Sequence, residues 1–382
     1  MVAIAAIDPL KTFSQRSSKW FTDCLTDRRD KLNMLPAKAH TLSSLLGLPF
    51  LVALRVDAME AFAEPVDVLN DGSGSISTAA GDFDGDGRME FISVLVQGSV
   101  DFRILDYDLG QGVFTTLGVG DGADTLDRFG GDVAAADMNG DGFLDVVLPN
   151  TTNAPGEASV IWYENPDGNL AGTWQEHLIS EWSGDGEEVV EHMAEIEVGD
   201  VNGDGWLDVV TRDVRQGFFV VLRESDGSGW RPRRLVSSNP REGLALADLD
   251  EDGDLDIVLN GIWFETPDDA ENGVYLPHTY KQHWYPESDR SGEKRDYACK
   301  VVAADLNGDL RTDIVVSNSE ELEDGALSVG KPTGIRAYLA PQNPLSSNWR
   351  EVLIESEHFS WLSLAVADED GAGDLAVFAG IS

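Results

Sequence analysis

A short acidic motif occurs six times along the chain, and a β-branched run follows each copy. The first copy is GDFDGDGRMEF, residues 81–91, which places Asp82, Asp84, Asp86 and Glu90 within nine residues. Carboxylates this close repel one another unless a cation lies among them. The motif therefore predicts a site for a hard cation that prefers oxygen ligands.

The copies share one spacing. Numbered from the first Asp, acidic or Asn residues occupy positions 1, 3, 5 and 9 in five full copies. The candidate ligands are Asp82, Asp84, Asp86 and Glu90; Asp137, Asn139, Asp141 and Asp145; Asp200, Asn202, Asp204 and Asp208; Asp248, Asp250, Asp252 and Asp256; and Asp305, Asn307, Asp309 and Asp313. The sixth copy, ADEDGAGDLAVF from residue 367, has Ala372 at position 5 and Ala376 at position 9. We therefore predict about five cation sites.

The motif differs from the helical calcium loop of the EF-hand, which needs a Glu at position 12 between two helices. Position 12 here is Ser, Leu, Thr, Leu or Val. The runs after position 9, such as FISVLV and IVVS, predict buried strands. The loop should therefore join two strands, with position 9 at the start of the second. Gly at position 6 permits the turn in four copies, whereas Leu310 in the fifth predicts a weaker site.

The spacing of the copies predicts the fold class. The first Asp residues lie 48 to 63 positions apart, and the residue before each is always Gly or Ala, which suggests a strand packed in a tight space near an axis. Further alternating runs, such as SVIWYENPDG and WQEHLIS, supply a third and a fourth strand. We predict an all-β protein, a β-propeller of four-stranded blades with six repeats visible.

These motifs resemble the FG-GAP/VCBS repeats of integrin-alpha-like, calcium-binding β-propellers, over roughly residues 64–382. The resemblance implies Ca²⁺ in about five loops and a binding or adhesion module for a glycan or a protein. The same scaffold also hosts polysaccharide lyases. The family commonly has seven blades, whereas this sequence stops after the second strand of its last unit. We therefore predict six or seven blades, with residues 64–70 closing the last blade imperfectly or with a truncated C-terminus.

The first 63 residues are predicted to be a leader ahead of a propeller domain at 64–382. With a start at Met34, the chain places Lys38 before an apolar stretch at 42–54 and a small-x-small site at residues 61–63, as in a secretory signal. The alternative is a membrane anchor, but the 13 residues of this stretch are fewer than the roughly 20 apolar residues that a membrane span needs. Cys24 lies in the leader, so Cys299 is alone and no disulfide framework is available. We expect a secreted, extracellular or periplasmic protein with no membrane span in the mature chain.

The net charge of the chain argues against some classes of binding partner. With 69 acidic and 27 basic residues, the formal net charge is −42, which makes nucleic acid and anionic membranes poor partners. No Ser/His/Asp order, phosphate-binding Gly loop or Cys/His metal cluster is present.

A functional face is expected at the end of the propeller away from the loops, at the mouth of the central channel. The candidates there are Arg128, His192, Arg241, Tyr297 and His358, with Trp361 nearby. Arg with His or Tyr suits uronate lysis, since Arg neutralises the carboxylate while His or Tyr abstracts a proton. We predict a binding module, with a polysaccharide lyase acting on uronate-containing glycans as the alternative.

Two further basic or aromatic features have structural interpretations. The insert at 278–297 concentrates bases and aromatics, but it is expected to be an ordinary fourth strand, with Trp284 in the core, followed by a long loop. His177, in WQEHLIS, is expected to be a strand residue rather than a catalytic group.

Overall fold

The chain forms an all-β propeller, seen here in a computed structural model. Within the ranges given below the chain forms 24 strands and no helix. The structure describes residues 3–7, 75–95, 102–108, 113–120, 128–129, 132–152, 158–182, 193–213, 217–235, 243–281, 299–318, 334–346, 348–355, 361–368 and 375–381.

Five sheets are complete antiparallel blades, each built from consecutive strands. Blade 1 contains β2 (Ser75–Gly81), β3 (Glu90–Leu95), β4 (Phe102–Asp108) and β5 (Val113–Gly120). Blade 2 has its innermost strand split into β6 (Arg128–Phe129) and β7 (Ala134–Ala136), which both pair with β8 (Asp145–Thr152), followed by β9 (Ala158–Glu164) and β10 (Gln175–Trp182).

Blades 3 to 5 repeat the four-stranded order. Blade 3 contains β11 (Met193–Gly199), β12 (Asp208–Asp213), β13 (Gly217–Arg223) and β14 (Trp230–Leu235). Blade 4 contains β15 (Leu244–Ala247), β16 (Asp256–Leu259), β17 (Ile262–Glu265) and β18 (Leu276–Thr279). Blade 5 contains β19 (Cys299–Ala304), β20 (Asp313–Asn318), β21 (Gly334–Leu339) and β22 (Arg350–Glu355). The predicted third and fourth strands are thereby confirmed in blades 2 to 5.

The last repeat forms a smaller, three-stranded sheet. Its hairpin of β23 (Trp361–Ala367) and β24 (Ala376–Ile381) is joined by β1 (Ala3–Ile7), which pairs antiparallel with β24. This corrects the predicted count of six or seven blades: the described residues form five complete blades. The last repeat contributes only two strands of its own, and its edge pairs with β1, from the predicted leader. Residues 64–70 and the predicted signal sequence lie outside the described residues.

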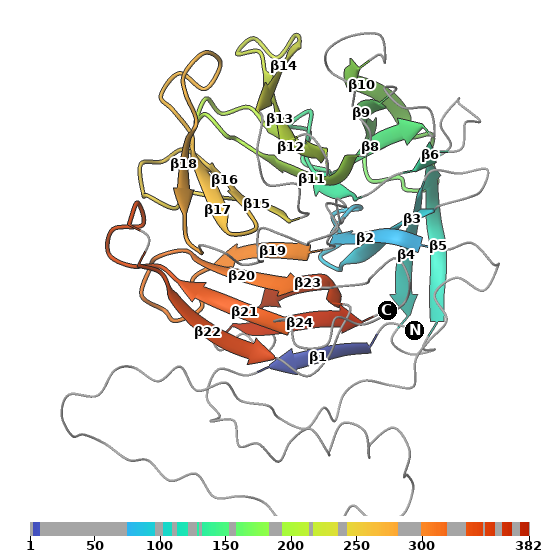
Figure 1. Ribbon diagram of the computed structural model, residues 1–382. Helices are drawn as coiled ribbons and strands as arrows, with labels where there is room; N and C mark the ends of the chain where they lie inside the picture. The colour runs from blue at the N-terminus through green and yellow to red at the C-terminus, as the bar shows by residue number, and fades with distance from the viewer. Residues whose placement is uncertain are drawn as a thin grey trace, which may run out of the picture.

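The sheets are arranged around a common centre (Figure 1). The first strands, among them β2, β11, β15, β19 and β23, lie innermost, and the last strands, such as β14, β18 and β22, lie at the outside. This is the radial arrangement that the Gly and Ala residues before each loop predicted.

Five clusters of buried apolar side chains fill the spaces between neighbouring sheets. Successive side chains of a strand point to opposite faces, so the second strands of blades 2 to 5 each contribute to two clusters. Val146 packs between blades 1 and 2, whereas its neighbour Val147 packs between blades 2 and 3. The uninterrupted β-branched runs after the loops are therefore explained by burial on both faces.

The residue at position 2 of each loop belongs to the interface with the next sheet. These residues are Phe83, Met138, Val201, Leu249 and Leu306. In the motif, the residues on either side of position 2 are candidate ligands, Asp at position 1 and Asp or Asn at position 3, and the apolar side chain between them packs against the neighbouring blade. Each of the five full loops is thus anchored in the hydrophobic core, and position 2 is apolar in all five.

The small residue before position 1 also has a local cause. A Cβ on Gly81 would lie 2.4 Å from Leu144 Cδ1, and one on Gly199 would lie 2.7 Å from Leu255 Cδ1. Both leucines occupy position 8 of the next loop along the chain. The space is therefore tight because the neighbouring loop packs there, in addition to the convergence on the axis.

Candidate metal centres

Each acidic loop closes the hairpin between the first and second strands of its sheet. The residue before position 1 pairs with position 9, as Gly81 does with Glu90 and Ala136 does with Asp145. Position 9 is therefore the first residue of the second strand in every blade, as the sequence predicted.

The loop backbone turns through left-handed conformations at positions 4 and 6. Position 6 has φ values of +86° at Gly87 and +103° at Gly253. The fifth loop keeps the same turn with a non-glycine residue, since Leu310 has φ +68° and is 88% exposed. A left-handed conformation costs an L-residue roughly 1–2 kcal/mol, so the fifth loop is strained where the sequence predicted weakness.

The carboxylate at position 1 organises the turn by accepting backbone N–H groups. Asp137 Oδ1 accepts from Gly140 N at 2.7 Å and from Asp141 N at 3.0 Å, and its Oδ2 accepts from Gly142 N at 2.9 Å. Asp305 accepts the equivalent three N–H groups in the fifth loop. Side-chain oxygens at positions 3 and 5 accept the N–H two residues ahead: in loop 1, Asp84 accepts from Asp86 N and Asp86 accepts from Arg88 N. The ligand positions are therefore held in place by the loop itself.

The carboxylate at position 9 connects the loop to the third strand. Asp145 Oδ2 accepts from Met138 N and its Oδ1 accepts from Asn165 N, both at 2.8 Å. Asp208, Asp256 and Asp313 make the same pair of contacts. Burial raises the pKa of each of these four carboxyls to about 7, and the charges of the nearby loop carboxylates add to the effect. Each oxygen still has a second lone pair for a cation.

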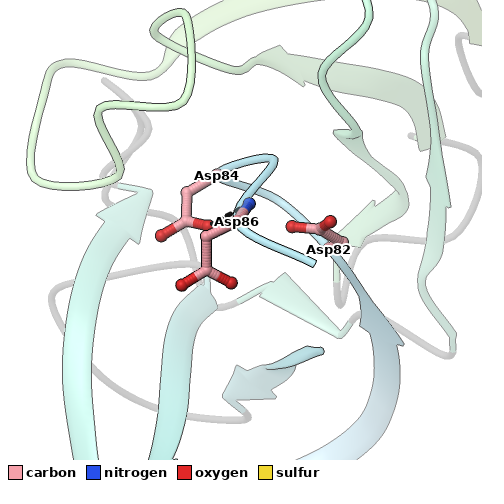
Figure 2. A group of neighbouring side chains, drawn as sticks. All are labelled: Asp82, Asp84 and Asp86. Carbon is pink, nitrogen blue, oxygen red and sulfur yellow. Dashed lines mark hydrogen bonds between the residues drawn. The ribbon is translucent and has the colours of Figure 1, made fainter. Parts of the chain in front are cut away.

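Two loops contain carboxylate oxygens that converge. Asp82, Asp84 and Asp86 bring ligand atoms within 4.8 Å of one another, and so do Asp248, Asp250 and Asp256. Figure 2 shows the first three carboxylates around the turn of the loop.

Some of the loop oxygens are buried without a hydrogen-bond donor. In the described part of the chain these are Asp82 Oδ1, Glu90 Oε1 and Asp250 Oδ1. Glu90 is fully buried, and burial, followed by repulsion from the three loop carboxylates, raises its pKa. Buried acceptors that lack a donor are costly. An all-oxygen, multiply charged set of this kind fits a hard cation such as Ca²⁺.

Loops 1 to 3 are also bonded to the next blade through their position-2 carbonyls. Asn165 Nδ2 donates to Phe83 O at 2.9 Å, Arg223 Nη1 donates to Met138 O, and Leu255 N donates to Val201 O at 3.2 Å. Whatever fixes the conformation of loops 1 to 3 therefore also fixes the contact between neighbouring blades.

The loops differ in what neutralises position 5. In loop 1, Arg88 Nε lies 3.1 Å from Asp86 Oδ2, and in loop 5 Arg311 pairs with Asp309. In loops 2 and 3 position 7 is Phe143 or Trp206 instead, so no arginine of the loop competes with a cation there. In the sixth loop, positions 2 to 7 lie outside the described residues.

The side chains of the predicted channel-mouth candidates all lie outside the described part of the structure, so their role stays a prediction. Arg128 is in β6 with its side chain outside the description, as is the side chain of Trp361 at the start of β23. His192, Arg241, Tyr297, His358 and Trp284 lie outside the described ranges.

Two histidines have structural roles that account for their positions. His177 is in β10, stacked on Trp162 at 4.3 Å between ring centroids, with Nε2 2.8 Å from Glu164. This confirms the expectation that it is a strand residue. His278 repeats the arrangement in β18, with Trp263 and Glu265. The start of the basic insert is thus an ordinary fourth strand, as predicted.

Comparison with protein families agrees with this architecture. The FG-GAP-like repeat family matches residues 82–148 and 200–259, which contain loops 1 to 4. Each match begins at the position-1 Asp of a loop that closes a propeller hairpin. This chain contains FG-GAP-like repeats. Its fold supports a binding or adhesion type of module.

No curated protein matches the FG-GAP chain. Among the described residues there is no helix of sufficient length and apolar character to cross a bilayer.

Proposed function

We propose that this FG-GAP propeller is a secreted binding module for a glycan or a protein, and that Ca²⁺ bound in its acidic loops clamps the blades together. The observation that carries the calcium proposal is the group of buried carboxylate oxygens without donors, Asp82 Oδ1, Glu90 Oε1 and Asp250 Oδ1. Folding would leave these charges desolvated and unpaired unless a cation compensates them.

The loop residues at positions 1, 3, 5 and 9 would hold the ion, which would supply positive charge to a cluster of carboxylates. The chain itself supplies the rest of the clamp. Position 1 fixes the turn through backbone N–H groups, position 2 packs into the next interface, and position 9 connects the turn to the third strand. Charge neutralisation at a loop would therefore strengthen the contact between two blades.

Secretion is part of the proposal because of the sequence. The apolar stretch at 42–54 with its small-x-small site is typical of an export signal. Because Cys299 is the one cysteine outside the predicted leader, no disulfide is available to stabilise an exported fold. Extracellular modules bind calcium at about 10⁻⁴–10⁻³ M, so an exported propeller would have its loops filled.

Calcium titration calorimetry with elemental analysis tests the metal component. We expect about five ions per chain, and Asp204→Ala, which removes position 5 of loop 3, should lower that number by about one. The control is Asp226→Ala, which removes an exposed carboxylate of the β13–β14 turn and should leave the stoichiometry unchanged. Six or more ions would mean that the sixth loop binds despite its alanines, and an absence of binding would refute the calcium proposal.

Arrays of glycans and extracellular proteins test the ligand component. A binding module should be retained on a defined ligand and should leave it chemically intact. A 235 nm absorbance from unsaturated uronate, lost in His192→Ala, Tyr297→Phe or His358→Ala with unchanged melting curves, would instead establish the lyase. If the protein binds calcium but is retained on none of the glycans or proteins, the binding-module proposal is refuted and the calcium proposal is not.

A further inference from the structure

The residues five places before position 1 occupy equivalent places at the other end of the innermost strands. In the six repeats they are Ser77, Asp132, Glu195, Gly243, Lys300 and Ser363. Unlike the loop positions, these positions carry a different residue type in nearly every repeat. The structure describes the contacts of the first five.

Polar contacts join these five residues into one continuous chain. Ser77 Oγ donates to Asp132 Oδ1 at 2.7 Å. Lys300 Nζ lies 3.6 Å from Asp132 Oδ2 and 3.5 Å from Glu195 Oε1. Gly243 N donates to Glu195 Oε2 at 2.5 Å. Since the five residues come from five different blades, the contacts link every complete blade. We call these five residues the axial clasp.

Lys300 is the centre of the axial clasp. Blade 5 is not a neighbour of blades 2 or 3 along the chain, so the contacts of its lysine with Asp132 and Glu195 cross the middle of the ring. Glu195 is only 3% exposed, and a carboxylate so deeply buried needs a compensating charge or donors. Lys300 provides that charge from the opposite side.

Gly243 is held by both of its backbone groups. Its N–H is bonded to Glu195, and its carbonyl accepts Arg212 Nη1 at 2.7 Å. The residue has φ +109°, a conformation that L side chains rarely adopt. The one glycine of the clasp is therefore explained by the close approach of blade 4 to two charged residues of blade 3.

Glu197 lies two residues from Glu195 on the same face of β11. The equivalent residues of the other repeats are small or apolar: Ala79, Ala134, Ala245, Val302 and Ala365. Burial raises the pKa of Glu197 to about 8, and the charges of Asp132 and Glu195 raise it further against the opposing effect of Lys300. An ionised Glu197 would add a third carboxylate to Asp132 and Glu195, whose charges already raise its pKa, with Lys300 as the cation that opposes them.

We propose that the axial clasp is a pH-sensitive device that holds the five blades together across the axis while Glu197 is protonated and is weakened when Glu197 ionises. The charged groups that act on Glu197 are Glu195 on its own strand, Asp132 ahead of β7 and Lys300 on β19. The described residues of β2 and β15 at equivalent positions along the innermost strands are Ser77, Ala79 and Ala245, and none of them is charged. The proposal does not depend on metal in the loops, because the clasp lies at the other end of the strands.

The direction of the pH effect follows from the raised pKa. The ordinary pKa of the carboxyl is 4.5, and the folded value is about 8. The contribution of Glu197 to stability is therefore complete below pH 4.5 and is lost as the pH rises through about 8.

Thermal unfolding from pH 5 to pH 9.5, in excess calcium throughout, tests the proposal. Glu197→Gln cannot ionise, so its melting temperature should equal that of the wild type at pH 5 and exceed it by several degrees at pH 9. The control Glu181→Gln, an exposed position in β10, should follow the wild type at every pH. Parallel curves for the wild type and Glu197→Gln would refute the proposal.

A second arm tests the contacts themselves. Lys300→Met should lower the melting temperature at every pH, whereas Lys281→Met, which breaks the surface pair with Glu351, should have little effect. If Lys300→Met does not fold, Ser77→Ala opens the first link of the clasp with a smaller change, and its melting temperature should fall. Equal stability of Ser77→Ala and the wild type would refute the continuous clasp. A Glu carboxyl ¹³C resonance that titrates near pH 8 and is absent in Glu197→Gln supports the assignment directly.

Discussion

The two ends of the innermost strands differ in how much their residues and contacts vary from blade to blade. At the end that carries the loops, the same residues make the same contacts in blade after blade, as Asp145 and Asp313 show. At the other end, Ser77, Gly243 and Lys300 occupy equivalent places but make contacts of different kinds, through a hydroxyl, a backbone N–H and an ammonium group.

The difference reflects what each region has to hold together. A loop stabilises one turn and one interface, so each blade needs its own copy and the sequence repeats. The axis is shared by all blades, so one lysine there can serve two carboxylates, and a second lysine beside it would repel the first. Residues that repeat from blade to blade therefore indicate an interaction made separately in each blade. Residues that differ at equivalent positions indicate an interaction that all the blades share.

Calcium removal is the largest expected effect and isolates the loop end. Each ion bound only in the folded state adds about 2.7 kcal/mol at a hundredfold excess over its dissociation constant. With several loops, EGTA should lower the melting temperature by roughly 10 °C or more, measured by calorimetry with the apo protein verified as metal-free. The decrease caused by Lys300→Met should be similar with and without EGTA if the two ends are independent. An unchanged melting curve in EGTA would contradict a structural role for the loops.

Truncation of the apolar side chain at position 2 is expected to have the next largest effect on stability. Met138 is 2% exposed in the interface between blades 2 and 3, and Met138→Ala should reduce the free energy of unfolding by about 2–5 kcal/mol through the cavity that it leaves. Denaturant unfolding provides the measurement. The matched change Leu178→Ala removes a side chain that is 54% exposed and should cost much less. Equal losses for the two variants would show that the loop is not anchored through this residue.

The smallest expected effect on stability concerns loop 5, in which Leu310 replaces the glycine at position 6. Leu310→Gly replaces a left-handed leucine with the residue that the other full loops have, so it should stabilise the fold by about 1 kcal/mol. Leu345→Gly is the control, because this exposed leucine is not among the residues with positive φ, and glycine there should be neutral or destabilising. A destabilised Leu310→Gly would mean that the leucine side chain makes a compensating contact.

Most of the propeller could be predicted from the sequence because its determinants are local and repeated. The 1, 3, 5, 9 spacing identified the loops, and the runs after position 9 identified strands that are buried on both faces. The make-up of the sixth sheet could not be predicted in this way, because the partner of β24 is β1, a segment distant in sequence with no repeat motif.

The sequence by itself determined the loops, the hairpins that they close and the polarity of their residues, since each depends on interactions within about nine neighbouring positions. The tertiary structure alone decided that Phe83 and Met138 pack into the next blade. It also decided that Lys300 meets Asp132 and Glu195, which are 168 and 105 positions away along the chain. Closing a ring brings the ends of distant strands together at one axis, and no periodicity in the sequence specifies which charges meet there.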